Sequence, residues 1–420
     1  MKNKIFFVLI SSVIVILFIP ISGMLQAQEN KPVYKIGGFV EFKTYFDDYR
    51  SQASRNALQY KYPLMPDLNA AGDDLNMSNS LNFSIAPTRL SLTVSNIRLK
   101  NADLVSYIEA DFMGSGESYL GMVNLRHAYI NINWKKSSLL FGQTDHLTVV
   151  KEVSAGTVAF GAGYPFNSLH RGMQIRYTGK LAEKISLLVA ADIYSSHKST
   201  GPANAQVMSG IPDIHAQIRF GDPKKLFGGI TIGYKTLKPR NYDITERLLS
   251  TTVEGFDING FFKAVMGGYS LKLWGIYGGN LSMYNMLGGY GKVYYSGNSN
   301  ILDFAYTNMT TLSLWGDFET PAFKKFNAGL FYGYQQNMGT IDPVDLSATS
   351  DLYFRDSKLE WFTRISPRLI YSPVKNLVFG LEYGLTFAQW SKSIDEYLKP
   401  VEKFEMNFNN RIEFMAKFVF

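Results

Sequence analysis

The chain has 420 residues, of which 46% are hydrophobic, 15% aromatic and only 18% charged, which suits neither a disordered chain nor an ordinary soluble domain. It has no cysteine, and this excludes a lipoprotein anchor, a disulfide scaffold, Cys-ligated zinc or iron–sulfur sites and a thiol nucleophile. The formal net charge of +7 is spread along the chain without a basic tail or a nucleic-acid-binding motif, so we expect no nucleic-acid partner.

Residues 1–27 are predicted to be a cleaved secretory signal peptide. Lys2 and Lys4 form a positive n-region, an apolar stretch follows over 5–21, and Leu25-Gln26-Ala27 is a plausible cleavage site. Because the apolar stretch is long for a signal peptide, an uncleaved N-terminal anchor is the alternative. No later segment approaches the roughly 18 uninterrupted apolar residues of a membrane-spanning helix. We therefore expect an exported chain whose mature part is 28–420.

From Tyr34 onward, apolar and polar residues alternate with a period of two, which is typical of strands with one greasy and one polar face. The last segment is the clearest example, because its even positions from Phe404 to Phe420 are apolar except for Asn410. About sixteen such segments are predicted. They lie near 33–46, 84–98, 101–113, 122–135, 137–144, 170–179, 184–195, 211–221, 226–236, 253–266, 268–280, 307–319, 324–337, 355–372, 375–391 and 402–420.

The connections between these segments alternate between short turns and long polar loops. The long loops are predicted near 47–83, 114–121, 145–169, 196–210, 237–252, 281–306, 338–354 and 392–401. This asymmetry and the even strand count are typical of outer-membrane barrels. We therefore predict an all-β fold, a transmembrane antiparallel β-barrel of about 16 strands in the outer membrane of a Gram-negative bacterium.

In such a barrel the apolar stripes face lipid and the polar stripes face the lumen, since only a closed barrel satisfies every backbone group in hydrocarbon. The lipid bilayer is therefore an expected partner. Aromatic residues near strand ends, such as Trp134, Trp315 and Trp390, are expected to form girdles at the membrane interfaces.

Several short motifs along the predicted strands form a recognisable pattern. They are the strand that opens on Arg89, the segment from Tyr107 to Phe112, Arg126-His127-Ala128-Tyr129 and Gly142-Gln143-Thr144. Further motifs are Gln174-Ile175-Arg176-Tyr177, the segment from Pro212 to Arg219, and the segment from Leu312 to Asp317. In these motifs the chain resembles the DcaP-like family of trimeric outer-membrane porins. The resemblance implies a homotrimeric channel whose third long loop, 145–169, folds into the pore. It also implies passive uptake of small, mainly anionic solutes such as dicarboxylates.

Strand parity predicts which charged side chains line the lumen. The predicted pore-lining residues are Arg89, Glu109, Asp111, Arg126, Arg176, Arg219, Arg364 and Arg368, and parity adds Arg411. The parity of Arg126 is ambiguous, because Ile130 and Ile132 would share its side; we assign it to the lumen since a lipid-facing arginine is costly. An arginine ladder suits anionic solutes, because the guanidinium binds carboxylates bidentately and stays charged.

Other functions are weighed against this porin hypothesis. A barrel lipase needs a hydroxyl nucleophile beside a His base, and His197-Lys198-Ser199 has no evident third member, so we predict no enzyme activity and no catalytic residues. Asp145-His146 could hold a metal, but five scattered histidines predict no coordinating cluster and no cofactor. The main alternative is a non-conducting barrel that acts as a surface scaffold or binding protein through its long loops. A neutral-sugar channel would need a run of lumen-facing aromatics, and parity predicts only scattered ones.

Overall fold

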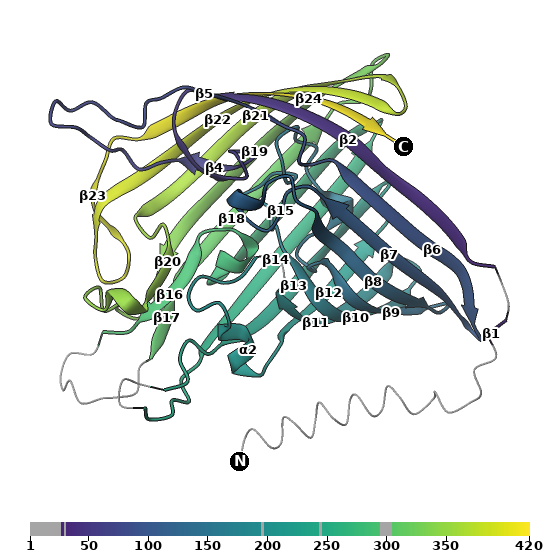
Figure 1. Ribbon diagram of the computed structural model, residues 1–420, viewed down its shortest axis with the longest axis horizontal. Helices are drawn as coiled ribbons and strands as arrows, with labels where there is room; N and C mark the ends of the chain where they lie inside the picture. The colour runs from purple at the N-terminus through teal and green to yellow at the C-terminus, as the bar shows by residue number, and fades with distance from the viewer. Residues whose placement is uncertain (1–26, 29–30, 195–196, 243–245, 295–304) are drawn as a thin grey trace.

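The computed structural model describes residues 27–28, 31–194, 197–242, 246–294 and 305–420 of the chain. The predicted signal peptide therefore lies, except for Ala27, outside the described residues. One antiparallel sheet closes on itself, because β2 (Val33–Asp47) pairs with β24 (Asn407–Val419) on one edge and with β5 (Ser80–Ser84) and β6 (Arg89–Leu99) on the other. The predicted sixteen-stranded barrel is confirmed, and Figure 1 shows β24 beside β2 where the barrel closes.

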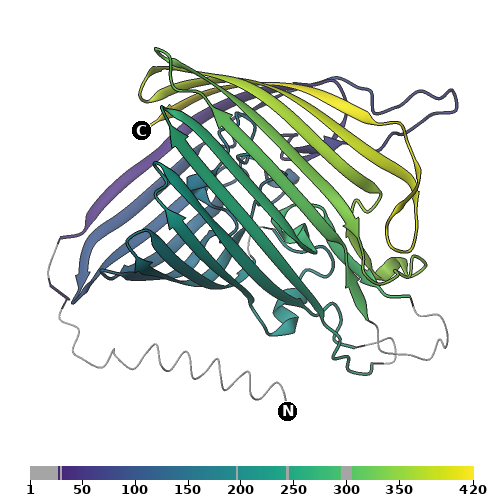
Figure 2. The same ribbon diagram turned by 180° about the vertical axis from the view of Figure 1, so that it is seen from behind.

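The other barrel strands follow in chain order, and each pairs with the barrel strand before it. They are β7 (Ala102–Asp111), β8 (Asn124–Asn133), β9 (Ser137–Asp145), β10 (Arg171–Ala182), β11 (Ile185–Tyr194), β12 (Asp213–Gly221), β13 (Leu226–Leu237), β14 (Val253–Met266), β15 (Tyr269–Gly279), β18 (Thr310–Glu319), β19 (Phe326–Gly339), β21 (Leu359–Val374) and β22 (Leu377–Ile394). Seen from behind, the green strands of the second half form one continuous oblique wall (Figure 2).

The second barrel strand is interrupted where the sequence predicted an unbroken one. Residues 85–88 separate β5 from β6, although both lie along the same edge of β2. Pro87 falls in the gap and has no N–H to donate to a ladder, which explains the break.

The strands alternate between an exposed apolar face and an inward face. In β14, Phe256 and Ile258 are exposed, whereas the alternate residues Asp257 and Asn259 are buried. This is the pattern expected of a barrel with its apolar stripes toward lipid. Among the described residues no helix is long and apolar enough to cross a membrane.

The expectation for the tryptophan girdle is wrong for two of its three members. Trp134 is exposed at the end of β8, but Trp315 and Trp390 are buried on the inward face. Strand alternation explains the inward position of Trp315, because its neighbour Leu314 faces outward. The indole of Trp390 donates instead to the carbonyl of Pro63 at 3.0 Å.

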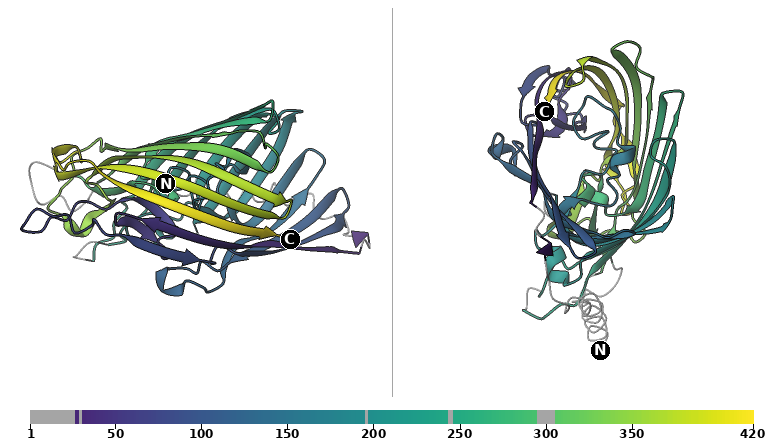
Figure 3. Two further views of the ribbon diagram at one scale, coloured as in Figure 1. Left: turned by 90° about the horizontal axis from the view of Figure 1, so that it is seen from above. Right: turned by 90° about the vertical axis from the view of Figure 1, so that its right-hand side faces the viewer.

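The long loops carry short elements of their own. These are the hairpin of β3 (Ser51–Ser54) and β4 (Gln59–Pro63), the small sheet of β16 (Gly288–Lys292), β17 (Tyr306–Asn308) and β20 (Leu352–Arg355), the strand β23 (Pro400–Lys403), and the helix α2 (Ala205–Ser209). The short strand β1 (Ala27–Gln28) precedes the barrel and pairs with the end of β6 at the opposite, short-turn end. Single 3₁₀ turns lie at Glu117–Tyr119, Lys151–Val153, Leu281–Tyr284 and Thr349–Asp351. The two views of Figure 3 show these loop elements gathered within and at one end of the barrel.

Candidate functional site: the barrel interior

Segment 145–169, which links β9 to β10, contacts inward-facing side chains far around the barrel. Trp274 of β15 donates to the carbonyl of Thr148 at 3.1 Å, and the backbone N–H of Gly156 donates to Asp317 of β18 at 2.9 Å. The small residue at 156 permits this approach, because a Cβ there would lie 2.0 Å from the Glu319 carboxylate. These hydrogen bonds attach the segment to β15 and β18, which lie across the barrel from β9 and β10, the strands that the segment connects.

A packed hydrophobic cluster fills the interior beside this segment. Its inward-facing aromatic side chains come from several barrel strands and include Phe261, Trp274, Trp315, Phe331 and Phe362, all at most 5% exposed. The segment 281–287, predicted as the start of a polar loop, turns inward and packs against them. Lumen-facing aromatics are thus more numerous than parity predicted. Within the described residues, the rings of this cluster are packed against each other and almost fully buried, so they do not offer a sugar an exposed path.

The first four predicted site residues meet on neighbouring strands. Arg126 donates from Nε to Glu109 at 2.6 Å and from Nη1 to Asp111 at 2.9 Å, and Arg89 Nη1 lies 3.7 Å from Glu109. The side chains of Asp111 and Arg126 are 1% and 8% exposed. The Arg126–Asp111 pair is therefore held almost entirely out of solvent, whereas the side chains of Glu109 and Arg89 are 14% and 28% exposed.

A β-bulge resolves the ambiguous parity of Arg126. Glu109 pairs with His127 and Ala110 pairs with Leu125, so Arg126 is the extra residue between them. The bulge turns Arg126 inward while Leu125 and Ile130 stay exposed on the outer face. A strict period of two cannot predict this, because one inserted residue reverses the alternation on one side of it.

Arg364 and Arg368 lie against segment 145–169 and acidic wall residues. Arg364 donates to Thr386 Oγ1 at 2.9 Å and to the carbonyls of Tyr164 at 3.0 Å and Lys61 at 2.5 Å. Arg368 Nη1 pairs with Asp317 at 2.6 Å. Both arginines are at most 5% exposed. The predicted arginine ladder required these two guanidinium groups to face the open lumen. Instead, both are enclosed by protein partners.

Arg176 and Arg219 both contact the first part of the same segment, at Asp145 and at Glu152. Arg176 donates to the carbonyl of Asp145 and, at 2.8 Å, to Gln174, while Arg219 Nη1 pairs with Glu152 at 3.1 Å. Both are partly exposed. Arg411, added by parity, pairs with Asp47 at 3.3 Å. The structure thus distributes the predicted residues among separate sets of partners.

A basic cavity lies between segment 145–169, the first long loop and the wall of β7, β8 and β10. It encloses about 310 Å³ and is lined by Arg55, Asp111, Arg126, Arg171 and Lys198, with His197 beside them. Burial and the charge of Arg171 lower the pKa of His197 to about 3, so this ring is neutral at pH 7. Four cationic side chains therefore face one carboxylate.

Three of these cations were missed by the sequence reasoning. Arg55 and Lys198 lie in long loops, where no period indicates direction. Arg171 shares its parity with the outward-facing Met173, yet it is buried at the first position of β10 and lines the cavity. Only the packing of the loops brings these side chains to Arg126.

Two of the five histidines, which were expected to be scattered, lie close together in the fold beside an aspartate. His146, Asp192 and His215 lie together inside the barrel, and each offers one ligand atom within 4.8 Å of the others. They come from the start of segment 145–169, from β11 and from β12. Because the three residues are far apart in the sequence, their proximity could not be predicted from it.

The closed sixteen-stranded barrel, its apolar outer face and its inward-folded third loop define an outer-membrane β-barrel of the porin class. Residues 48–227 match the family model described as DcaP outer membrane protein, and the resemblance predicted from the sequence is confirmed. The chain is accordingly an outer-membrane protein. No curated protein sequence matches the chain.

Solved porin structures share the fold. The crystal structure of the outer membrane channel DcaP of Acinetobacter baumannii is 19% identical, with a TM-score of 0.67 over 94% of this chain and 99% of that one. The anion-selective porin from Comamonas acidovorans is 9% identical, with a TM-score of 0.56 over 93% and 100%. The trimer form of OmpT of Vibrio cholerae is 10% identical, with a TM-score of 0.55 over 93% and 100%.

Proposed function

We propose that the chain is a passive diffusion porin that prefers small hydrophilic anions such as dicarboxylates. The observation that carries this proposal is the basic cavity, where Arg55, Arg126, Arg171 and Lys198 outnumber the carboxylate of Asp111. A pore discriminates among solutes by the width and charge of its narrowest part. One solved porin of the same fold is anion-selective, which supports the proposal.

The cationic residues of the cavity have different roles in this proposal. Arg126 is held by Glu109 and Asp111, so it contributes charge from a fixed position. Arg55 donates from Nη2 to the carbonyl of Gly114 at 3.2 Å, and its guanidinium lines the cavity. Arg55 therefore has donors to offer a passing carboxylate, which the planar guanidinium suits well.

Segment 145–169 is the proposed constriction loop of this pore. Its contacts with β15, β18 and β21 fix it in the interior, and the hydrophobic cluster closes the space on that side. Solute would then pass along the wall of β7 to β11, where the basic cavity lies. We further propose that three chains assemble, as in the trimer form of OmpT, and that transport requires neither catalysis nor a cofactor.

A non-conducting barrel that serves as a surface scaffold is the second candidate. The observation that favours it is the hydrophobic cluster, which fills a large part of the interior with side chains that are almost fully buried. If it leaves no continuous water path, the long loops become the functional surface.

Purified protein in a planar lipid bilayer separates the two candidates. A porin gives ohmic insertions that close in three substeps, with a reversal potential under a salt gradient that shows anion preference. Arg55→Gln is expected to reduce that preference. Arg98→Gln is the matched control, because Arg98 lies at the short-turn end of β6 with a side chain 58% exposed and is paired with Asp103. Folded barrels that insert but conduct nothing would overturn the porin proposal and favour the scaffold.

A further inference from the structure

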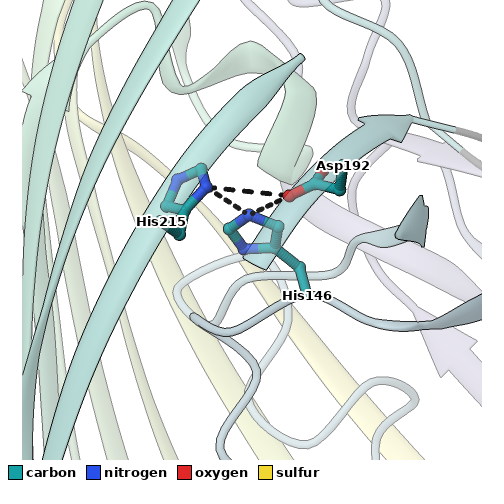
Figure 4. A group of neighbouring side chains, drawn as sticks. All are labelled: His146, Asp192 and His215. Carbon is teal, nitrogen blue, oxygen red and sulfur yellow. Dashed lines mark hydrogen bonds and ion pairs between the residues drawn. The ribbon is translucent and has the colours of Figure 1, made fainter. Parts of the chain in front are cut away.

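The cluster of His146, Asp192 and His215 has no role in the proposed passage of solutes. We propose that these three residues bind a divalent first-row transition metal, with Zn²⁺ as the ion that best fits their geometry. The ion would fasten the start of segment 145–169 to β11 and β12 of the barrel wall. Figure 4 shows the three side chains converging on one point from these three parts of the chain.

The distances between the three ligand atoms match a tetrahedral zinc site. His146 Nε2 lies 3.1 Å from His215 Nδ1 and 3.4 Å from Asp192 Oδ2, and His215 Nδ1 lies 3.7 Å from Asp192 Oδ2. Zinc binds imidazole nitrogen and carboxylate oxygen at about 2.0–2.2 Å, which places tetrahedral ligand atoms about 3.3–3.5 Å apart. One of the three separations lies in this range and the other two, 3.1 and 3.7 Å, lie about 0.2 Å outside it, so small side-chain shifts suffice to place an ion between the atoms.

Both histidines have the outer hydrogen bonds that orient metal ligands. The Nε2 of His215 lies 3.0 Å from the hydroxyl of Tyr284, which donates in turn to Asp257 at 3.0 Å. Ligating histidines commonly donate their second N–H in this way, and the partner fixes the tautomer. With Nε2 protonated, the Nδ1 of His215 presents its lone pair to the cluster.

Thr148 supports His146 in either protonation state. Its hydroxyl oxygen lies 2.9 Å from Nδ1, and its backbone N–H donates to the same nitrogen at 3.2 Å. The hydroxyl hydrogen is directed to Ser168, so its oxygen is able to accept from Nδ1–H. With the proton on Nδ1, the ring donates to the Thr148 hydroxyl oxygen and no longer accepts from the Thr148 backbone N–H. This tautomer leaves the lone pair of Nε2 for the ion.

The negative charge of the carboxylates around the cluster also favours a bound cation. Asp192, Asp213 and Asp257 are all at most 5% exposed. Asp257 accepts from Tyr284, but within the described residues Asp192 accepts no hydrogen bond, and its Oδ2 lies 3.4 and 3.7 Å from the nitrogens of His146 and His215. Burying a carboxylate without a hydrogen bond is costly. Lys235 lies nearby but donates to the carbonyl of Asn280. A divalent ion at Asp192 would compensate the negative charge directly, and imidazole with carboxylate is a donor set that suits zinc.

A fourth coordination position remains for water or for His170. The side chain of His170 is buried, its ring centroid lies 5.3 Å from that of His146, and neither ring nitrogen has a hydrogen-bond partner within the described residues. The cluster itself is at most 1% exposed, so the ion would enter while the barrel folds. Its binding free energy would then stabilise the attachment of the constriction loop.

The test is the metal content of the full mature chain, refolded in detergent with ZnCl₂ and washed with a chelator after folding. Heat-modifiable mobility on SDS gels identifies the folded barrel. We expect about one zinc per folded chain by mass spectrometry, and Co²⁺ in its place should show the visible bands of a tetrahedral site. His146→Gln, Asp192→Asn and His215→Gln are each expected to fold with the zinc lost.

The matched control is His127→Gln, because His127 is equally buried on an inward face but lies outside the cluster. It should retain zinc like the unmodified chain. Tyr284→Phe keeps the ring and removes the hydroxyl beside His215, so it should fold and bind zinc about 10- to 100-fold more weakly. If the unmodified folded chain takes up no zinc or Co²⁺, or if the His146 and His215 variants retain the zinc of the control, the metal site is refuted and the cluster is a hydrogen-bonded one.

Discussion

Removing the guanidinium of Arg126 should destabilise the barrel because it leaves the buried carboxylate of Asp111 without its ion-pair partner, with only the more distant cations of the cavity around it. The side chain of Asp111 is 1% exposed, and Arg126 is its only ion-pair partner within the described residues. Breaking one half of a buried pair costs about 3–5 kcal/mol. Asp111 keeps hydrogen bonds from Asn124 at 2.8 Å and from the Met113 N–H at 3.1 Å, so we expect Arg126→Gln to cost about 3 kcal/mol.

Removing both charges should recover most of this loss. The double variant Arg126→Gln/Asp111→Asn has no uncompensated charge at position 111, and Glu109 is less buried, at 14% exposed. We expect it within about 1 kcal/mol of the unmodified protein. The assay is urea unfolding of the detergent- or lipid-embedded barrel, followed by gel mobility and tryptophan fluorescence for all four members of the cycle. Equal instability of the single and double variants would show that Arg126 acts by packing and would refute this reasoning.

The same two variants separate the charge of the cavity from its shape. Arg126→Gln removes one positive charge, whereas the double variant restores the net charge of the unmodified cavity. A unit charge about 4 Å from an ion in water is worth about 1 kcal/mol, or about a fivefold change in partition, and less at high salt. Anion preference in the bilayer should therefore fall about fivefold at low salt in the single variant and return in the double variant. An unchanged preference in both would show that solutes do not pass by this cavity.

Three further outcomes are expected. Arg364→Met leaves two buried carbonyls, including that of Tyr164, without their donor, so it should lower unfolding stability by about 2–4 kcal/mol while reversal potentials stay close to those of the unmodified protein. Burial and, second, the positive charge of Arg355 lower the pKa of Lys61 to about 7, so above that pH the unfolded chain binds more protons than the folded chain and the unmodified protein gains stability as pH rises. Lys61→Met removes this titration. In urea unfolding, the stability of Lys61→Met relative to the unmodified protein should therefore fall by about 1 kcal/mol per pH unit between about pH 7.5 and 9. Gly142→Ala should reduce the folded yield, because φ is +130° there and a Cβ would lie 2.2 Å from the carbonyl of Ala128, whereas Gly260→Ala, with nothing within 4 Å, should fold normally.

The alternation of residues along the sequence was sufficient to predict the barrel. A strand places successive side chains on opposite faces, so a period of two reports directly which residues face lipid, without knowledge of any neighbour. The predicted segment 253–266 coincides with β14, and 226–236 with β13 to within one residue. The longer connections could likewise be counted, because loop length is a local property of the chain.

The contents of the interior depended on contacts that the sequence does not record. Parity placed Arg364 and Arg368 in the lumen, but their exposure depends on where segment 145–169 lies, and that segment encloses them. The inward position of Arg126 depends on a bulge, which exists only as a mismatch between two paired strands.

Arg55 and Arg126 come together through the fold of the long loops, and His146 and Asp192 through barrel closure and strand register. Such long-range contacts form because packing side chains that are far apart in the chain lowers the free energy of the fold. No local sequence pattern encodes them. The sequence by itself therefore determined the barrel and its two faces. Only the tertiary structure decided which inward side chains are enclosed, which line the cavity, and which meet at the proposed metal site.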